Sequence, residues 1–342
     1  MGKQLGLSLI ILFLLFFLPW LWSEPAPEYP PDPAPQENIP NLNHTDSTPD
    51  AVLLSDGSTD STVMLRVLIQ GQLQEMDMAS YLMGVVRSEM PASFSSEALK
   101  AQAVAARTYT YHKMRSGGST NHPLADACDD ISCCKAYMEQ TAAAANWGAQ
   151  APVWEAKIRQ AVADTDGECV LYEDEPVLAV FHSSSAGATL NAADVWSSSL
   201  PYLQSVSSPE NEDTVPNYHS SATFSSGELQ VILQSAFPQA DFSSRPSDWF
   251  TNMQLQPNGT VTSLTVGGVP VSGNQLRTAL GLRSACFSIS FTGDTVTFSV
   301  TGYGHGVGMS QYGANVLAAN GMDYREILAW YYTGTTVGLY TP

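Results

Sequence analysis

Positive charge is scarce in this sequence. Lys and Arg number 14 against 33 Asp and Glu among 342 residues, which gives a formal net charge of −19 at pH 7. A surface that binds nucleic acid or anionic headgroups needs a cationic face, because phosphates are negatively charged. The composition therefore argues against nucleic acid as a partner, and a glycan polymer remains compatible with it.

Charged residues of both signs are few, at 14%, whereas 44% of the residues are hydrophobic. This balance permits a sizeable core and does not favour wholesale disorder. No internal repeat is evident, and the length suits one large domain or two modest ones. Cysteines are also few, and their odd number excludes a complete disulfide framework. They are Cys128, Cys133, Cys134, Cys169 and Cys286.

One long apolar run occupies residues 5–22, close to the N-terminus. It could be a signal peptide or an uncleaved membrane anchor. Residues 20–24 offer no pair of small residues for a peptidase, and tryptophans at the outer end with Lys3 at the inner end suit an anchor. We therefore expect a single-pass anchor over residues 1–23, which holds the domain outside the cell membrane. A disordered Pro-, Ser- and Asp-rich linker is expected over residues 24–61.

The rest of the chain mixes helical and strand patterns without regular βαβ units, which predicts an α+β fold. We expect a single mixed α/β domain over residues 62–340. This domain could form two lobes around a cleft. The predicted helices cover residues 78–88, 95–115, 149–164 and 323–330. The predicted strands cover residues 62–69, a hairpin of 169–172 with 177–182, and several short runs between 251 and 300.

Glu89 is the first candidate for chemistry. It falls on the apolar stripe of a short predicted helix, seven residues after Leu82 and four after Val85. Partial burial would raise the pKa of this carboxyl group and keep it protonated, as a general acid requires. Periodicity alone favours a different interpretation, in which Glu89 forms a structural ion pair with Arg87 or Arg107.

A second candidate is the group His122, Cys128, Cys133 and Cys134. One imidazole and three thiols could hold a tetrahedral Zn²⁺, and four protein ligands would make the site structural. A Cys128–Cys134 disulfide is an alternative that an extracytoplasmic location permits. Free thiols are a third.

Two polar loops complete the candidates. His182 and Ser184 follow an apolar strand; a Ser/His pair suggests a nucleophile, but without a Gly-x-Ser-x-Gly elbow we favour ligand contact. Residues 302–313 are rich in glycine, which permits close approach of a polymer to the backbone. A Gly-rich turn buried against the domain is the alternative there. The βαβ context of a dinucleotide-binding loop is missing.

Taken together, these segments resemble the stage II sporulation protein D family and its relatives described as amidase enhancers. The most specific blocks contain Glu89-Met90-Pro91 at one end and the Gly-rich segment at the other. The matching stretches are residues 81–91, 97–109, 181–183, 194–196, 200–203, 304–314 and 330–334.

The resemblance implies a membrane-anchored lytic transglycosylase that acts on peptidoglycan during sporulation and engulfment. Such a lyase cuts between N-acetylmuramic acid and N-acetylglucosamine without water and leaves a 1,6-anhydro-muramyl end. The Glu of the family's Glu-Met-Pro motif corresponds to Glu89. It would act first as acid and then as base, so no second carboxylate is required, unlike in ordinary glycosidases. The implied substrate is a glycan strand freed of its stem peptides, and the implied partners are sporulation proteins P and M.

The resemblance also implies a structural zinc in some members. His122, Cys128 and Cys134 fall where its ligands are expected, and Cys133 stands where a His can occur. Ser184 departs from the family pattern, which often has a Cys there, and this leaves Cys169 without an obvious partner.

Several other residues are expected to line the substrate cleft, with no individual role assigned. They are Arg107, His182, Ser184, His305 and Gln311. The enhancer relatives imply a rival function of another class, a non-catalytic wall-binding module that stimulates a peptidoglycan amidase.

Overall fold

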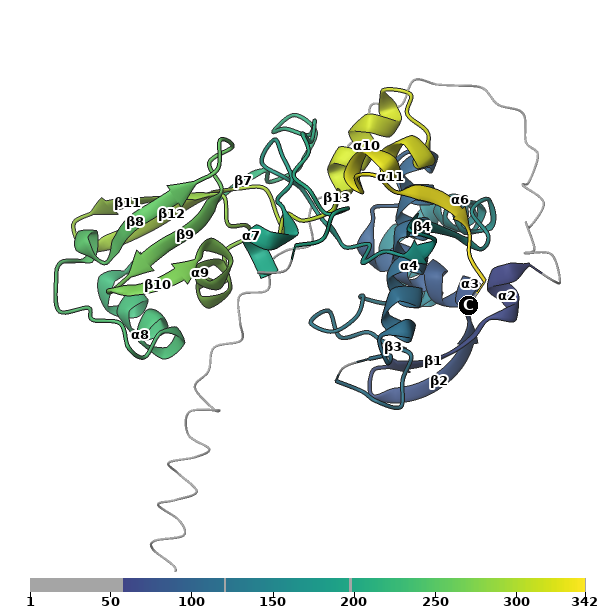
Figure 1. Cartoon of the computed structure of the whole chain (residues 1–342), viewed down its shortest axis with the longest axis horizontal. Coiled ribbons are helices and arrows are strands. Elements are labelled where there is room, and N and C mark those ends of the chain that lie inside the picture. Colours follow the sequence, from purple (N-terminus) through teal and green to yellow (C-terminus); the bar gives the residue numbers. More distant parts are fainter. Residues whose placement is uncertain (1–57, 120, 197–198, 342) are drawn as a thin grey trace, which may run out of the picture. The chain divides into compact units, whose positions relative to one another are not determined.

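The first apolar run after the linker forms β1 (Met64–Ile69), close to the predicted strand. The computed structural model describes residues 58–119, 121–196 and 199–341 (Figure 1). The predicted anchor and most of the predicted linker lie outside these ranges. Within them, no helix is both long enough and apolar enough to cross a membrane. A short helix, α2 (Thr59–Thr62), precedes β1, so folded structure begins before the expected boundary at residue 62.

A long alanine-rich helix, α4 (Ser96–Arg115), is central to the larger hydrophobic core. Its buried alanines let other helices and strand β4 pack closely against it. The preceding helix, α3 (Met78–Glu89), begins at Asp77, whose carboxylate accepts a hydrogen bond from the Ser80 amide. Both helices are confirmed nearly as predicted. The other helices of this core are α5 (Gln140–Trp147), α6 (Ala151–Ala163), α10 (Gln311–Ala319) and α11 (Tyr324–Tyr331), with the 3-10 turn η1 (Gly148–Gln150) between α5 and α6.

Small sheets surround these helices (Figure 1). One has the order β2-β1-β3, in which β3 runs parallel to β1. A second has the order β14-β4-β5, and a third is the two-stranded parallel pair β13-β6. The strands are β2 (Gln72–Asp77), β3 (Ala127–Cys128), β4 (Glu168–Tyr172), β5 (Glu175–Pro176), β6 (Phe181–His182), β13 (Met309–Ser310) and β14 (Thr336–Leu339).

The predicted hairpin of residues 169–172 with 177–182 is wrong in its second half. The Ala179 amide bonds to the Val177 carbonyl, and the Val180 amide bonds to the Leu178 carbonyl. These tight turns take the chain out of the hairpin, because each bond spans only two residues. Phe181 then pairs with Met309 instead.

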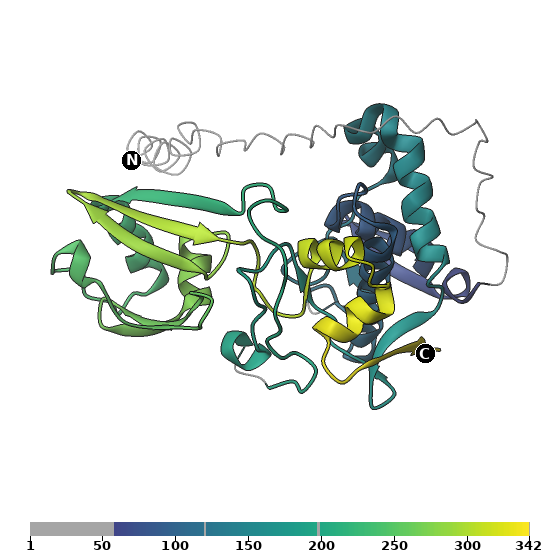
Figure 2. The same cartoon turned by 90° about the horizontal axis from the view of Figure 1, so that it is seen from above.

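A second hydrophobic core lies between β6 and β13 in the sequence and is formed by residues 222–300. Its strands form two three-stranded sheets, β10-β9-β8 and β11-β12-β7, with α8 and α9 packed against them (Figures 1 and 2). The mixed α/β prediction is therefore confirmed, with two cores. This region comprises β7 (His219–Ser225), α8 (Ser226–Ala236), η2 (Pro246–Asp248), β8 (Phe250–Leu255), β9 (Val261–Val266), β10 (Val269–Ser272), α9 (Gly273–Leu280), β11 (Phe287–Thr292) and β12 (Thr295–Thr301).

Candidate active site

Glu89 is the last residue of α3, and its side chain is half-buried. One carboxylate oxygen, Oε1, accepts a hydrogen bond from the Ala136 amide at 3.1 Å. Burial raises the pKa of Glu89, and the positive charge of Lys135 and the Ala136 amide offset only part of that rise. Among the residues that the structure describes, no other carboxylate contributes to this shift. Glu89 is therefore a single carboxyl group that stays protonated to a higher pH than usual.

The ion-pair alternative for Glu89 is wrong, because both arginines have other partners. Arg87 holds Glu155 with two hydrogen bonds of 2.6 and 2.9 Å. Arg107 pairs with Asp60 of α2 at 2.6 Å, and neither side chain is exposed. Arg107 cannot contact a glycan from this position, so the expectation that it lines the cleft is also wrong.

The segment that faces Glu89 is fixed by close packing on α3. A Cβ atom on Gly84 would lie 2.0 Å from Cε2 of Tyr137, so only glycine permits this approach. The Met138 amide bonds to the Gly84 carbonyl at 3.0 Å. This packing holds the Ala136 amide against the carboxylate of Glu89.

Lys135, directly before this amide, supplies a cation to the site. Its ammonium lies 3.9 Å from the ring centroid of Phe181 and 4.2 Å from that of Tyr109. Such cation–π contacts partly replace the hydration that a half-buried ammonium loses. Burial lowers the pKa of Lys135 to about 8, while Glu89 and Cys134 act in the opposite direction.

Three of the predicted zinc ligands come together. The sulfur atoms of Cys128, Cys133 and Cys134 all lie within 4.8 Å of one another. The sulfurs of Cys133 and Cys134 are 3.8 Å apart, about the separation of two thiolates on one tetrahedral zinc with Zn–S bonds of roughly 2.3 Å. All three cysteines are free, so no Cys128–Cys134 disulfide is formed.

His122 does not belong to this cluster, although the sequence suggests it as the fourth ligand. Its backbone instead closes a turn, in which its amide bonds to Ser119 and its carbonyl accepts from Ala125. The three thiols fit zinc by ligand type and spacing, and the predicted histidine ligand does not.

His182 is buried and tied into the fold by both ring nitrogens. Nδ1 lies 3.2 Å from the Val307 carbonyl, and Nε2 lies 2.7 Å from the Ser185 hydroxyl. A carbonyl only accepts, so we assign the ring proton to Nδ1, and Ser185 then donates to Nε2. Burial lowers the pKa of His182 to about 4, which keeps the ring neutral at pH 7. Since Ser185 is also buried, this pair braces the loop rather than presenting a nucleophile.

His305 lies between the buried His182 and a more exposed ring. Its centroid is 5.5 Å from that of His182 and 5.3 Å from that of Trp196. Trp196 is 41% exposed, which makes it available to stack on a sugar ring. The structure therefore adds Trp196, at the end of α7 (Ala192–Trp196), to the candidate cleft residues.

Gln311 and Ser184 are both buried. Gln311 donates from Nε2 to the backbone carbonyl of Glu89 at 2.8 Å, so it positions the end of α3. The Ser184 hydroxyl has no hydrogen-bond partner among the described residues and lines a small cavity with His305 and Cys286. Neither side chain is placed for direct contact with a long polymer.

A buried carboxylate that the sequence did not reveal joins several of these segments. Glu210 accepts hydrogen bonds from the Ser185 amide at 2.6 Å and from the hydroxyls of Ser208 and Ser310. It thereby links the loop after β6 to the start of α10. Glu210 lies in a loop without periodicity, so no local pattern marks it.

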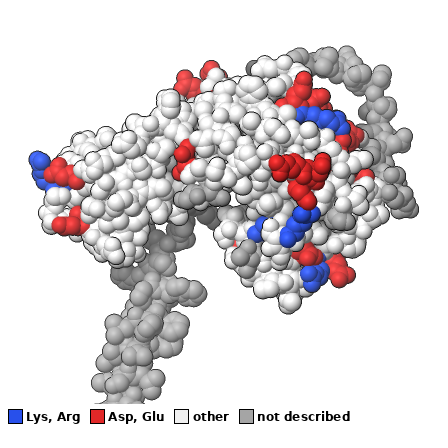
Figure 3. Space-filling view, viewed as in Figure 1, with Lys and Arg blue, Asp and Glu red and all other residues white. Residues whose placement is uncertain are grey.

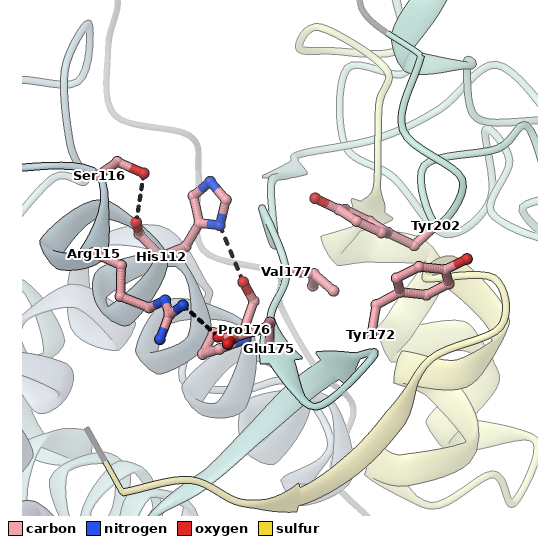
Figure 4. A pocket seen from close by; sticks show the side chains of 8 residues that line it. All are labelled: His112, Arg115, Ser116, Tyr172, Glu175, Pro176, Val177 and Tyr202. Carbon is pink, nitrogen blue, oxygen red and sulfur yellow. Dashed lines mark hydrogen bonds and ion pairs between the residues drawn. The ribbon is translucent and has the colours of Figure 1, made fainter.

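A cavity of about 370 Å³ lies elsewhere, between the end of α4 and the β4–β5 turn (Figure 4). In it, Arg115 pairs with Glu175, and Nδ1 of His112 lies 3.0 Å from the Pro176 carbonyl. None of the residues expected to act on a substrate lines this cavity, so its size is no guide to the chemistry. The lining residues are His112, Arg115, Ser116, Tyr172, Glu175, Pro176, Val177 and Tyr202.

Comparison with known proteins defines the class to which this fold and site belong. Residues 70–172 match the family described as Stage II sporulation protein, and this range includes Glu89 and the three clustered cysteines. The chain belongs to the stage II sporulation protein D family, which is involved in processing the cell wall during sporulation.

Individual relatives support this membership over most of the chain. Stage II sporulation protein D of Bacillus subtilis (strain 168) is 38% identical over 265 residues, 78% of this chain and 75% of the relative. The protein of the same name from Bacillus amyloliquefaciens is 36% identical over the same shares. The Amidase enhancer of Bacillus subtilis (strain 168) is 31% identical over 306 residues, 76% of this chain but 40% of the relative.

Proposed function

We propose that this chain is a lytic transglycosylase that cleaves peptide-free glycan strands of peptidoglycan, with Glu89 as its acid and base. The observation that carries the proposal is the isolation of Glu89. Its carboxyl group is half-buried, has a raised pKa, and interacts with an amide and an ammonium rather than with a second carboxylate. A hydrolase of the usual kind would need that second carboxylate.

The proposed reaction requires no water. Protonated Glu89 gives its proton to the glycosidic oxygen as the bond from that oxygen to C1 of the muramyl residue breaks. The resulting carboxylate then removes the proton from the 6-hydroxyl of the same residue. The oxygen of that 6-hydroxyl then bonds to C1 and closes the 1,6-anhydro ring. Glu89, which has taken the hydroxyl proton, is protonated again. The ammonium of Lys135 and the Ala136 amide favour the carboxylate between the two steps, because both interact better with the charged form.

The proposal includes the setting expected from the sequence. The chain would be held on the membrane by residues 1–23, act outside it, and work with sporulation proteins P and M. Cys128, Cys133 and Cys134 would hold a structural zinc, whose fourth position is left to solvent. Bound zinc would cross-link the three thiolates and add to the free energy of folding.

The test is to incubate the full-length protein with peptide-free glycan strands and seek anhydro-muramyl ends by mass spectrometry. Wild type should produce them, and Glu89→Gln should not, because an amide cannot donate that proton. Glu75→Gln serves as a matched control, since it makes the same change at an exposed position on β2.

Two results would count against the proposal in different ways. Full activity in Glu89→Gln would be consistent with the proposed enzymatic function but would show that Glu89 is not its acid and base. No anhydro product from wild type, together with stimulation of an added amidase, would establish the wall-binding enhancer function instead.

A further inference from the structure

Most of the Lys and Arg residues in the described ranges form an ion pair with a carboxylate. Most of the Lys and Arg atoms on the face in Figure 3 adjoin Asp or Glu. Lys157 donates to the backbone carbonyls of Ser93 and Phe94, and Lys113 also has an interaction partner. The exceptions are Lys135, Arg277 and Arg283, which form no ion pair with a described carboxylate. The paired cations are Arg66, Arg87, Lys100, Arg107, Arg115, Arg159, Arg245 and Arg325.

Two of these three unpaired cations are tied to the Gly-rich loop. Arg277, on α9, donates from Nε to the Arg283 carbonyl at 3.1 Å. The same carbonyl accepts from the Gly304 amide at 2.8 Å, and the Arg283 guanidinium lies 4.4 Å from the Tyr303 ring centroid. The Nε of Arg283 is buried and has no acceptor among the described residues. A buried donor without an acceptor is costly, so this N–H is a donor whose hydrogen bond a ligand could still supply.

Lys135 reaches the same loop from the opposite part of the sequence. Its ammonium packs on Phe181. The next residue, His182, places its ring 5.5 Å from His305, which directly follows Gly304. The charges of Lys135 and Arg277 both add to the effect of burial in lowering the pKa of His305. All three unpaired cations therefore adjoin the Gly-rich loop, and Lys135 also adjoins Glu89.

This local excess of positive charge favours an anionic ligand. With a net charge of −19, the chain repels anions in general, so an anionic polymer can be attracted only where cations are locally in excess. Peptidoglycan presents such an anion when its stem peptide is removed, because the lactyl group of muramic acid changes from an amide to a free carboxylate. A planar guanidinium and an ammonium both form strong charge-assisted hydrogen bonds to carboxylates.

We propose that Lys135, Arg277 and Arg283 form a carboxylate-binding subsite that reads the free lactyl groups of the strand and so selects peptide-free glycan. The inference rests on the proposed function for its choice of polymer. Of the three cations, Lys135 is the one whose charge acts on Glu89, so we assign it the lactyl group of the muramyl residue that is cleaved. It acts as a specificity-determining residue, because it touches the substrate but takes no part in the bond changes.

The test measures binding rather than cleavage. Full-length protein carrying Glu89→Gln is titrated with peptide-free strands and with the same strands after conversion of their lactyl carboxyls to primary amides. We expect amidation to weaken binding by about tenfold or more, as the loss of one charge-assisted hydrogen bond implies. Adding Lys135→Gln should reduce this discrimination, because one of the three cations is lost, and Lys135→Arg should restore part of it. Arg245→Gln is the control, since it removes the same charge from an exposed side chain.

Three outcomes would overturn the subsite. The Glu89→Gln protein could bind strands with free lactyl carboxylates and strands with amidated lactyl groups equally well. Lys135→Gln could weaken both to the same extent, which would make its role structural. Poly(glycerol phosphate) could compete as well as the strands do, which would indicate a general anion site. The proposed function fails separately, through the absence of anhydro products from wild type.

Discussion

The buried ion pair of Arg107 with Asp60 gives a prediction about stability. Replacing Arg107 by Met removes a guanidinium that is fully buried and leaves Asp60 without its partner. Removing one member of a buried pair costs about 3–5 kcal/mol, because an uncompensated charge remains in the core. For a urea m-value of about 3 kcal/mol per M, the unfolding midpoint of Arg107→Met should fall by roughly 1–1.7 M.

This loss should depend on pH in a defined direction. Burial raises the pKa of Asp60 above its ordinary 3.8, and Arg107 opposes that rise. Without Arg107 the folded-state pKa rises further, so between about 3.8 and that value the folded variant binds a proton that the unfolded chain does not. The deficit of Arg107→Met should therefore be smaller at pH 5 than at pH 8, as urea titrations followed by circular dichroism at both pH values would show.

Two further variants test whether the loss of stability comes from the buried, unpaired charge of Asp60. Arg66→Met breaks a pair whose arginine side chain is 49% exposed, and it should cost at most about 1 kcal/mol. Combining Arg107→Met with Asp60→Leu removes both charges and should recover most of the stability. If Arg107→Met instead folds with wild-type stability and loses affinity for glycan strands, Arg107 is the cleft residue that the sequence suggested.

The remaining predictions concern the site itself. Gly84→Ala should reduce cleavage more than stability, because the new methyl group displaces Tyr137 and with it the amide that faces Glu89; equal losses in activity and unfolding midpoint would refute this. The cleavage rate should fall as pH rises through the raised pKa of Glu89, since only the protonated acid can donate, and a rate independent of pH from 4 to 8 would contradict it. Ser185→Ala should retain most of the cleavage activity, and complete loss with a native fold would revive the serine nucleophile. Cys134→Ser should lower the zinc content of the purified protein below the one ion per chain expected for wild type, as metal analysis would show; zinc-free wild type would remove the metal from the proposal.

The helices were predictable because their signals are local. The apolar spacing before Glu89 predicts α3, and the alanine-rich run after Ser95 predicts α4, each within a few residues. The partner of Phe181 was not predictable in this way. Its strand pairs with Met309, which lies far along the chain, and two tight turns just before it leave no mark in the apolar pattern.

The site shows the same division between local and distant information. Glu89 could be found from its place on a helix and in a motif, but its hydrogen-bond donor is a backbone amide, which has no sequence signature. Arg107 was assigned to the cleft because motif membership does not distinguish a ligand contact from a buried ion pair. Its partner, Asp60, lies in a stretch whose composition predicts a linker.

The arrangement around Cys134 joins two features that the sequence presents as separate. From the sequence, the cysteines are predicted only as a structural metal site, separate from the cleft. In the structure, Cys134 is followed directly by Lys135 and Ala136, whose ammonium and amide are the groups that act on the pKa of Glu89. Any shift of the cysteine cluster therefore moves the two groups that stabilise the carboxylate form of Glu89. Since that form must exist between the two proposed proton transfers, we expect the cluster to support the proposed chemistry by fixing where the ammonium and the amide lie.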